Sequence, residues 1–157
     1  MFNRRHLTWA AVLVSLLMIG GIASMTSAQD GDIITLTDDD PQSLIGAIND
    51  ANASSVLTII ELMPDATYSL TDARDGISLD VGPTAVGLPI IESMIRITGN
   101  GATIERDLEA EDEFRIMDVS SSGSLLLEDA TIRGGYLTPT SSVGGAIQNF
   151  GTLQING

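Results

Sequence analysis

The sequence predicts an all-β protein in which short strands stack as successive turns of a β-solenoid, preceded by one short helix. Three observations predict this class. From Asp32 onward, apolar and polar residues alternate in short runs that are separated by Gly, Asp, Asn and Ser. Similar runs recur at steps of about 30 residues, and a single segment near the N-terminus has helical spacing instead.

The composition excludes several classes of function. The chain has 157 residues, with 7 Lys+Arg, all of them Arg, and 21 Asp+Glu, for a net charge of −14. Residues 1–28 hold two of the arginines and no acid, so the net charge of the rest of the chain is 5 − 21 = −16. So acidic a surface repels the phosphate backbone of nucleic acids. We expect no nucleic-acid partner.

The residue types also argue against common cofactor chemistry. The chain has no Cys, and beyond residue 28 it has no His and no Lys. Thiolate, imidazole and Schiff-base catalysis therefore lack their residues, as do zinc fingers, haem and iron–sulfur sites. We expect no cofactor and no metal site.

Residues 1–28 have the order of a secretory signal peptide. Arg4 and Arg5 precede an uncharged, largely apolar stretch, and the small residues Thr26 and Ala28 occupy the −3 and −1 positions of a cleavage site before Gln29. A retained signal anchor is the alternative, because the uncharged stretch is nearly long enough to span a bilayer. The expected location is extracellular, secreted or at the cell surface, including an outer membrane.

Residues 29–55 are predicted to form an N-terminal cap that contains the helix. Asp40 is placed as N-cap and Pro41 as the first helical residue. One face of the predicted helix is apolar and consists of Leu44, Ala47, Ile48 and Ala51.

Residues 56–157 are predicted to be the solenoid. Three similar strands lie at 93–99, 124–130 and 152–157, and their equivalent positions Ile95, Leu125 and Leu153 follow one another at steps of about 30 residues. Shorter strands accompany them at 102–105 and 130–133, and at 116–119 and 146–149. Propeller blades are usually longer, about 40 residues or more. Stacking would create two interior rows, Ile95, Leu125 and Leu153 beside Ile97, Leu127 and Ile155, with Arg96, Leu126 and Gln154 pointing outward.

Two segments resemble a known family. Residues 42–52, QSLIGAINDAN, resemble the C-S-L-R-E-A-I-x-x-A-N segment of secreted bacterial right-handed parallel β-helix proteins, in which a strand like residues 58–70 follows. Residues 144–153 resemble the Gly-Gly-Ala-Ile element of polymorphic outer membrane protein repeats. Gln42, Ile45 and Gly46 stand where the family has Cys, Arg and Glu. The resemblance implies a right-handed parallel β-helix at the cell surface, often an adhesin-like passenger region, whose motifs define no catalytic residues.

The expected function is therefore that of an exported structural or adhesive module without catalysis, which binds a carbohydrate or protein ligand of a cell surface or matrix. The alternative is the N-terminal part of a carbohydrate-active β-helix enzyme, similar to a polysaccharide lyase or glycoside hydrolase. Its candidate acids are the outward-facing Glu105, Asp118 and Glu128, with Arg96 or Arg133 to bind an anionic group.

Two acidic clusters are interpreted as structural. Asp38, Asp39 and Asp40 form a solvated turn and helix cap rather than a Ca²⁺ site. The second cluster is a solvated insertion between strands, because its spacing lacks the glycine-containing order of a Ca²⁺ loop. It comprises Asp107, Glu109, Glu111, Asp112 and Glu113. The pairs at 134–135 and 144–145 are interpreted as turn glycines that need positive φ or close backbone approach.

The last strand, at 152–157, is followed by no helix, charged edge or proline-rich stretch. Such an end leaves backbone groups and an apolar cross-section in water. We expect either that the chain is part of a longer protein or that it self-associates through this end.

Overall fold

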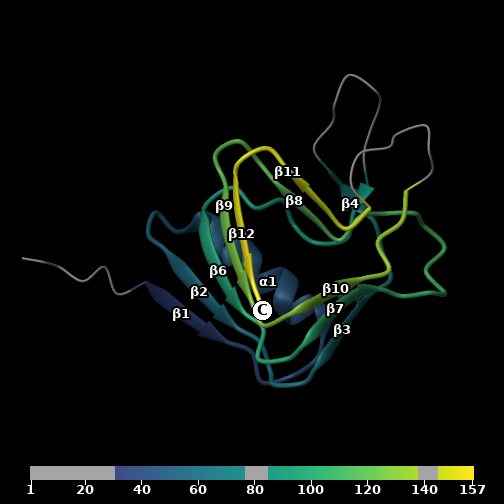
Figure 1. Ribbon diagram of the computed structural model, residues 1–157, viewed down its shortest axis with the longest axis horizontal. Coiled ribbons are helices and arrows are strands. Elements are labelled where there is room, and N and C mark those ends of the chain that lie inside the picture. Colours follow the sequence, from purple (N-terminus) through teal and green to yellow (C-terminus); the bar gives the residue numbers. More distant parts are fainter. Residues whose placement is uncertain (1–30, 77–84, 138–144) are drawn as a thin grey trace, which may run out of the picture.

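The computed structural model describes residues 31–76, 85–137 and 145–157 (Figure 1). The predicted signal peptide at 1–28, its cleavage site before Gln29, and Gly144 lie outside these residues. The first described elements are β1 (Asp32–Thr35), α1 (Pro41–Ala53), β2 (Thr58–Glu61), β3 (Thr67–Leu70), β4 (Arg74–Asp75) and β5 (Ala85–Val86). There follow β6 (Met94–Thr98), β7 (Thr103–Arg106), β8 (Met117–Val119), β9 (Ser124–Glu128), β10 (Thr131–Arg133), β11 (Ile147–Asn149) and β12 (Thr152–Asn156).

The fold is mostly β with one short helix. Among the described residues, three of the four sheets consist of parallel strands. The five-stranded sheet has the order β1-β2-β6-β9-β12, the three-stranded sheet β10-β7-β3, and a two-stranded sheet pairs β11 with β8. From β6 onward the chain enters these three sheets in turn and then returns beside its own previous strand, as Figure 1 shows for β6, β9 and β12. The antiparallel pair β4–β5 is an addition that the sequence did not predict.

The register confirms the two predicted interior rows. Ile95 lies opposite Leu125, which lies opposite Leu153, while Ile97, Leu127 and Ile155 form the neighbouring row. Residues of the central strands in these rows are at most 1% exposed. Each such side chain contributes about 1.5–3 kcal/mol through removal of apolar surface from water. The accompanying short strands also pair as predicted, β7 with β10 and β8 with β11.

Ser93 lies directly before β6 and donates its hydroxyl to the carbonyl oxygen of Ala51 in the helix (2.9 Å). One detail of the predicted strands is wrong. The single strand expected over residues 58–70 is two strands, β2 and β3. Asp65 lies between them with φ of 56°, a left-handed conformation that extended chain does not have.

The turn at Asp65 recurs in the following repeats. Asn100 and Asp129 also have positive φ, 52° and 48°, and each follows a strand of the five-stranded sheet. The turns are hydrogen-bonded to one another: Asp65 N–H donates to the Asn100 carbonyl (3.1 Å), and Gly101 N–H donates to the Asp129 carbonyl (2.9 Å). Asn and Asp tolerate this conformation better than other side chains do. These turns direct the chain from the five-stranded sheet into the three-stranded sheet.

Helix α1 confirms its prediction closely. The Asp40 carboxylate accepts a hydrogen bond from Gln42 N–H (2.9 Å) as the N-cap, and Pro41 begins the helix. Its buried residues are the predicted four together with Ile45. The helix contacts β2, β3 and β6, so it covers apolar surface near the N-terminal strands. No helix among the described residues is long and apolar enough to cross a membrane.

Candidate binding surface

The outward face of the five-stranded sheet carries an apolar depression. Its volume is about 350 Å³, and its lining consists of Leu57, Met94, Ile95, Arg96, Ser124 and Leu126. Met94 is 46% exposed, and Arg96 and Leu126 are neighbours in the register of β6 and β9. Exposed apolar area next to a charged group is typical of surfaces that bind a ligand or a partner.

Polar side chains beside this depression join neighbouring strands. The guanidinium of Arg96 on β6 pairs with the carboxylate of Glu128 on β9 at 2.6 Å. Asn156 on β12 donates its amide N–H to the same carboxylate at 3.3 Å. The outward residues therefore form cross-strand contacts in addition to facing solvent, which the sequence did not indicate.

A second set of such contacts lies on the outer face of the three-stranded sheet. Ser69 on β3 donates its hydroxyl to Glu105 on β7 (2.9 Å), and Arg133 on β10 forms an ion pair with the same carboxylate. A depression of about 320 Å³ adjoins this pair. Its lining is Glu105, Arg106, Leu108, Arg133 and Gly134.

The environment of Glu105 changes its acidity. The hydrogen bond from Arg133 lowers the pKa of the Glu105 carboxyl below its ordinary value of 4.5, burial opposes this, and the bond from Ser69 lowers the pKa further. The charged form is thus stabilised by folding.

This shift predicts how the stability contribution of Glu105 depends on pH. Because the pKa is lower in the folded chain, the stabilisation is complete above the unfolded pKa and is lost as pH falls through the folded pKa. We expect Glu105→Gln to lower the free energy of unfolding by about 0.2–1 kcal/mol at pH 7, since Arg133 is largely exposed. In urea titrations, the difference from the parent chain should shrink toward pH 3. Glu111→Gln, in an exposed loop position, is the control; a Glu105→Gln effect that grows at low pH would contradict the prediction.

The third candidate acid is not outward-facing, which corrects the sequence prediction. The Asp118 side chain is fully buried and pairs with the equally buried Arg115, Nε to Oδ1, at 3.2 Å. Gln148, which lies opposite Asp118 in the register of β11 and β8, is 5% exposed. All three residues of β8 are buried, so this strand is covered on both faces. Alternation of apolar and polar residues in the sequence cannot show this, because it predicts one exposed face.

The candidate acids are therefore not brought together. Glu128, Glu105 and Asp118 lie on three different sheets, each beside an arginine. Burial lowers the pKa of the Arg115 guanidinium from its ordinary value, while the charge of Asp118 raises it.

The two acidic clusters occupy the predicted turn and loop. Beside the cap at Asp40, the Asp38 carboxylate accepts a hydrogen bond from Asp40 N–H (3.2 Å). The loop at 107–113 is held by the Arg106 guanidinium, which donates to the carbonyl oxygens of Ala110 (2.6 Å) and Asp112 (2.8 Å). Across residues 31–76, 85–137 and 145–157, no group of three or more His, Cys, Asp or Glu is placed to hold a metal ion.

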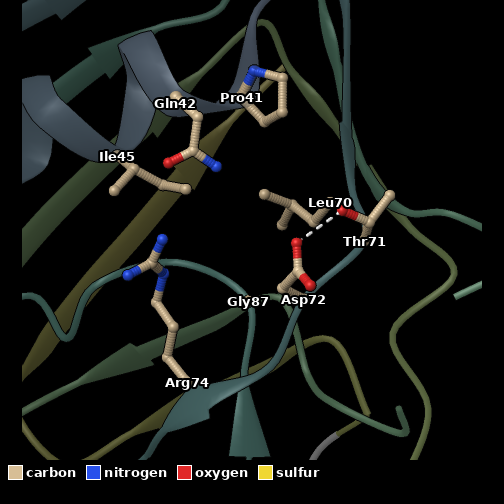
Figure 2. A pocket seen from close by; sticks show the side chains of 8 residues that line it. All are labelled: Pro41, Gln42, Ile45, Leu70, Thr71, Asp72, Arg74 and Gly87. Atoms are coloured by element: carbon tan, nitrogen blue, oxygen red, sulfur yellow. Dashed lines mark hydrogen bonds between the residues drawn. The ribbon is translucent and has the colours of Figure 1, made fainter. Parts of the chain in front are cut away.

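A smaller pocket lies at the start of α1 (Figure 2). Gln42 from the helix and Arg74 from β4 point toward each other across it, and Thr71 donates its hydroxyl to Asp72 at 2.8 Å. Its volume is about 10 Å³, which is room for about one water molecule. The pocket is too small for an organic ligand.

Two structural residues were missed in the sequence. Asn52 donates its amide to the Ile90 carbonyl (2.7 Å) and accepts from Glu92 N–H (2.9 Å), so it joins the helix to the chain before β6. Tyr68 is fully buried, with its hydroxyl donating to the Asp38 carbonyl (2.9 Å), and burial raises its pKa. An asparagine at a helix end and a lone aromatic in a strand were the only signals.

Comparison with known proteins found no match to a family model, to a curated protein or to a solved structure.

Proposed function

We propose that the chain is an exported structural and adhesive module with a right-handed parallel β-helix fold, capped by α1. The observation that carries the fold is the in-register parallel pairing, in three sheets, of strands that lie one repeat apart in the sequence. One solenoid coil per repeat accounts for this pairing, because equivalent residues of successive coils then lie side by side.

The binding face in this proposal is the outer face of the five-stranded sheet. Its depression combines apolar side chains from β6, β9 and the residue before β2 with Arg96, which pairs with Glu128. Such a mixture suits a carbohydrate or protein ligand of a cell surface or matrix, which presents apolar patches and hydrogen-bonding groups together. Catalysis is not part of the proposal, since each candidate acid lies beside an arginine on a separate sheet.

The test compares two leucine variants of the secreted chain in a binding assay with intact cells and extracted matrix. We expect Leu126→Arg, at a residue that lines the depression, to weaken binding by about tenfold, as removal of one central interface contact does. Leu108→Arg is the control, because Leu108 is 89% exposed and lies in a loop outside this face.

Equal effects of the two substitutions, or none, would contradict the proposed face. Release of reducing or unsaturated ends from polysaccharides in the same assay would instead support the enzyme alternative. The mass of the N-terminal peptide of the secreted chain tests export, since cleavage before Gln29 makes Gln29 its first residue.

A further inference from the structure

The outer face of the five-stranded sheet is organised in rows of side chains that run across its strands. Because the strands pair in register and side chains alternate between the two faces, outward residues of neighbouring strands line up about 4.8 Å apart. One such row consists of Ile33 on β1, Ile59 on β2, Arg96 on β6 and Leu126 on β9. The next row, two residues further along the same strands, consists of Thr35, Glu61, Thr98 and Glu128.

The first row and the depression beside it form an apolar area that reaches from β1 to β9. We call it the apolar stripe, and its exposed or partly exposed residues are Ile33, Leu57, Ile59, Met94 and Leu126. Ile33 is 62% exposed and Met94 is 46% exposed. Helix α1 does not cover the stripe, because the buried residues of the helix pack in the core with the inward residues of the sheet.

The neighbouring row is acidic, and one of its two carboxylates has no cation beside it. Glu128 pairs with Arg96 at 2.6 Å. Glu61 belongs to none of the ion pairs among the described residues, and it accepts a hydrogen bond from the Thr35 hydroxyl at 3.1 Å. Glu61 is partly buried, so water solvates its charge incompletely, and a cation supplied by a ligand is attracted more strongly there than at a fully exposed acid.

The residue types of this face favour a protein ligand over a carbohydrate. None of the five described strands of the sheet contains an aromatic residue, and aromatic rings offer the large, flat apolar surface on which a sugar ring stacks. The aliphatic side chains of the stripe instead pack well against other aliphatic side chains. With the carboxylate of Glu61 beside them, they fit a ligand that carries both aliphatic side chains and a cation.

The ligand must also satisfy its own backbone groups. The outer face presents side chains, because the backbone groups of β2 and β6 pair with the strands on either side. A helix forms its backbone hydrogen bonds internally, whereas an extended segment would leave such groups unpaired against aliphatic side chains. A helix that lies across the strands advances about 5.4 Å per turn, close to the strand spacing of about 4.8 Å, so its successive turns meet successive strands.

We propose that the binding face takes a basic amphipathic helix of a partner protein, which lays aliphatic side chains along the apolar stripe and sets a lysine or arginine beside Glu61. The net charge of −14 attracts such a helix from solution. The four strands from β1 to β9 span about 14 Å, which corresponds to about 10 helical residues. This inference rests on the proposed binding face and adds the class of its ligand.

The first test measures binding of two synthetic peptides by fluorescence anisotropy. Each is an alanine-rich helix of about 18 residues with leucines along one side, and the positions beside the leucines are lysine in one peptide and glutamate in the other. We expect the lysine peptide to bind about tenfold more tightly or better, and Met94→Gln to weaken its binding by about tenfold. Leu108→Gln, in an exposed loop outside this face, is the control and should have no effect.

The second test exchanges the charge at Glu61. Glu61→Lys should weaken binding of the lysine peptide by about 100-fold and strengthen binding of the glutamate peptide. Glu111→Lys makes the same change of net charge in the loop at 107–113, and should change both affinities by less than about threefold, because salt screens distant charges. Glu61→Gln keeps the shape of the side chain and should weaken binding of the lysine peptide by about tenfold. Circular dichroism melts establish that the variants are folded.

Equal affinities for the two peptides, equal effects of substitution at Glu61 and Glu111, or binding of neither peptide would overturn the inference. The assay with cells and matrix separates this failure from failure of the proposed function. If Leu126→Arg weakens that binding and Glu61→Lys does not, or if glycosidase treatment of the matrix abolishes it, the proposed face stands and its ligand is not a basic helix. If neither substitution has an effect, the proposed function fails as well.

Discussion

Replacing Arg115 by alanine is expected to lower the free energy of unfolding by about 3–5 kcal/mol, the largest effect of any single arginine in the described chain. Arg115 and Asp118 are both fully buried and pair at 3.2 Å. Removal of the guanidinium leaves the carboxylate buried without this ion pair, so the desolvation of that charge loses the attraction of Arg115 that offsets it. Urea unfolding followed by circular dichroism measures the change.

The matched control is Arg96→Ala. Arg96 pairs with Glu128 at a shorter distance, 2.6 Å, but its side chain is 41% exposed, so its loss should cost only about 0–1 kcal/mol. The double variant Arg115→Met with Asp118→Leu should recover much of the stability, because apolar replacement removes both desolvation penalties. Equal losses for Arg115→Ala and Arg96→Ala would show that burial does not determine the strength of these pairs.

Replacing Gly123 by alanine is expected to destabilise the fold by about 1–3 kcal/mol or more, as overpacking does. A Cβ on Gly123 would lie 2.2 Å from the carbonyl oxygen of Ile91 in the preceding repeat. Since this neighbour is backbone, the two repeats must move apart. Gly151 occupies the same corner one repeat later, where a Cβ would lie 2.3 Å from the Gly123 carbonyl.

The opposite sign is expected for Gly46→Ala. Gly46 is in the middle of α1, and apart from its chain neighbours and the backbone of the helix itself no atom lies within 4 Å of an added Cβ there. The helix should gain about 0.8–1 kcal/mol, because alanine loses less backbone entropy than glycine does. Thermal melts of the two variants compare the same substitution at a crowded and an open position. Destabilisation by both would mean that the space at Gly46 does not govern the result.

The helix and the interior rows were predictable because each depends on a local pattern. The cap at Asp40 and the apolar face of α1 are set by residues three and four positions apart. The row of Ile95, Leu125 and Leu153 follows from alternation within a strand and from the regular spacing of similar strands along the sequence. Neither requires knowledge of distant contacts.

The candidate sites were less predictable. Glu105 and Glu128 face outward as expected, but their arginine partners come from neighbouring repeats, and the in-register pairing that joins them is a property of the sheets. The burial of Asp118 also depends on the packing around β8 rather than on its neighbours in sequence. Asp65, Asn100 and Asp129 are of residue types that tolerate positive φ, which is a signal for a turn. At Asp65 this signal would have divided residues 58–70 into two strands.

The sequence by itself determined the charge, the absence of thiol chemistry, the capped helix and the alternation that separates interior from exterior. Composition and the spacing of similar segments can be read from the sequence without a structure. Only the tertiary structure decided which outward residues meet and which acid is buried with an arginine. These depend on the register between strands of successive repeats, because one step of register exchanges the buried and exposed faces of a strand.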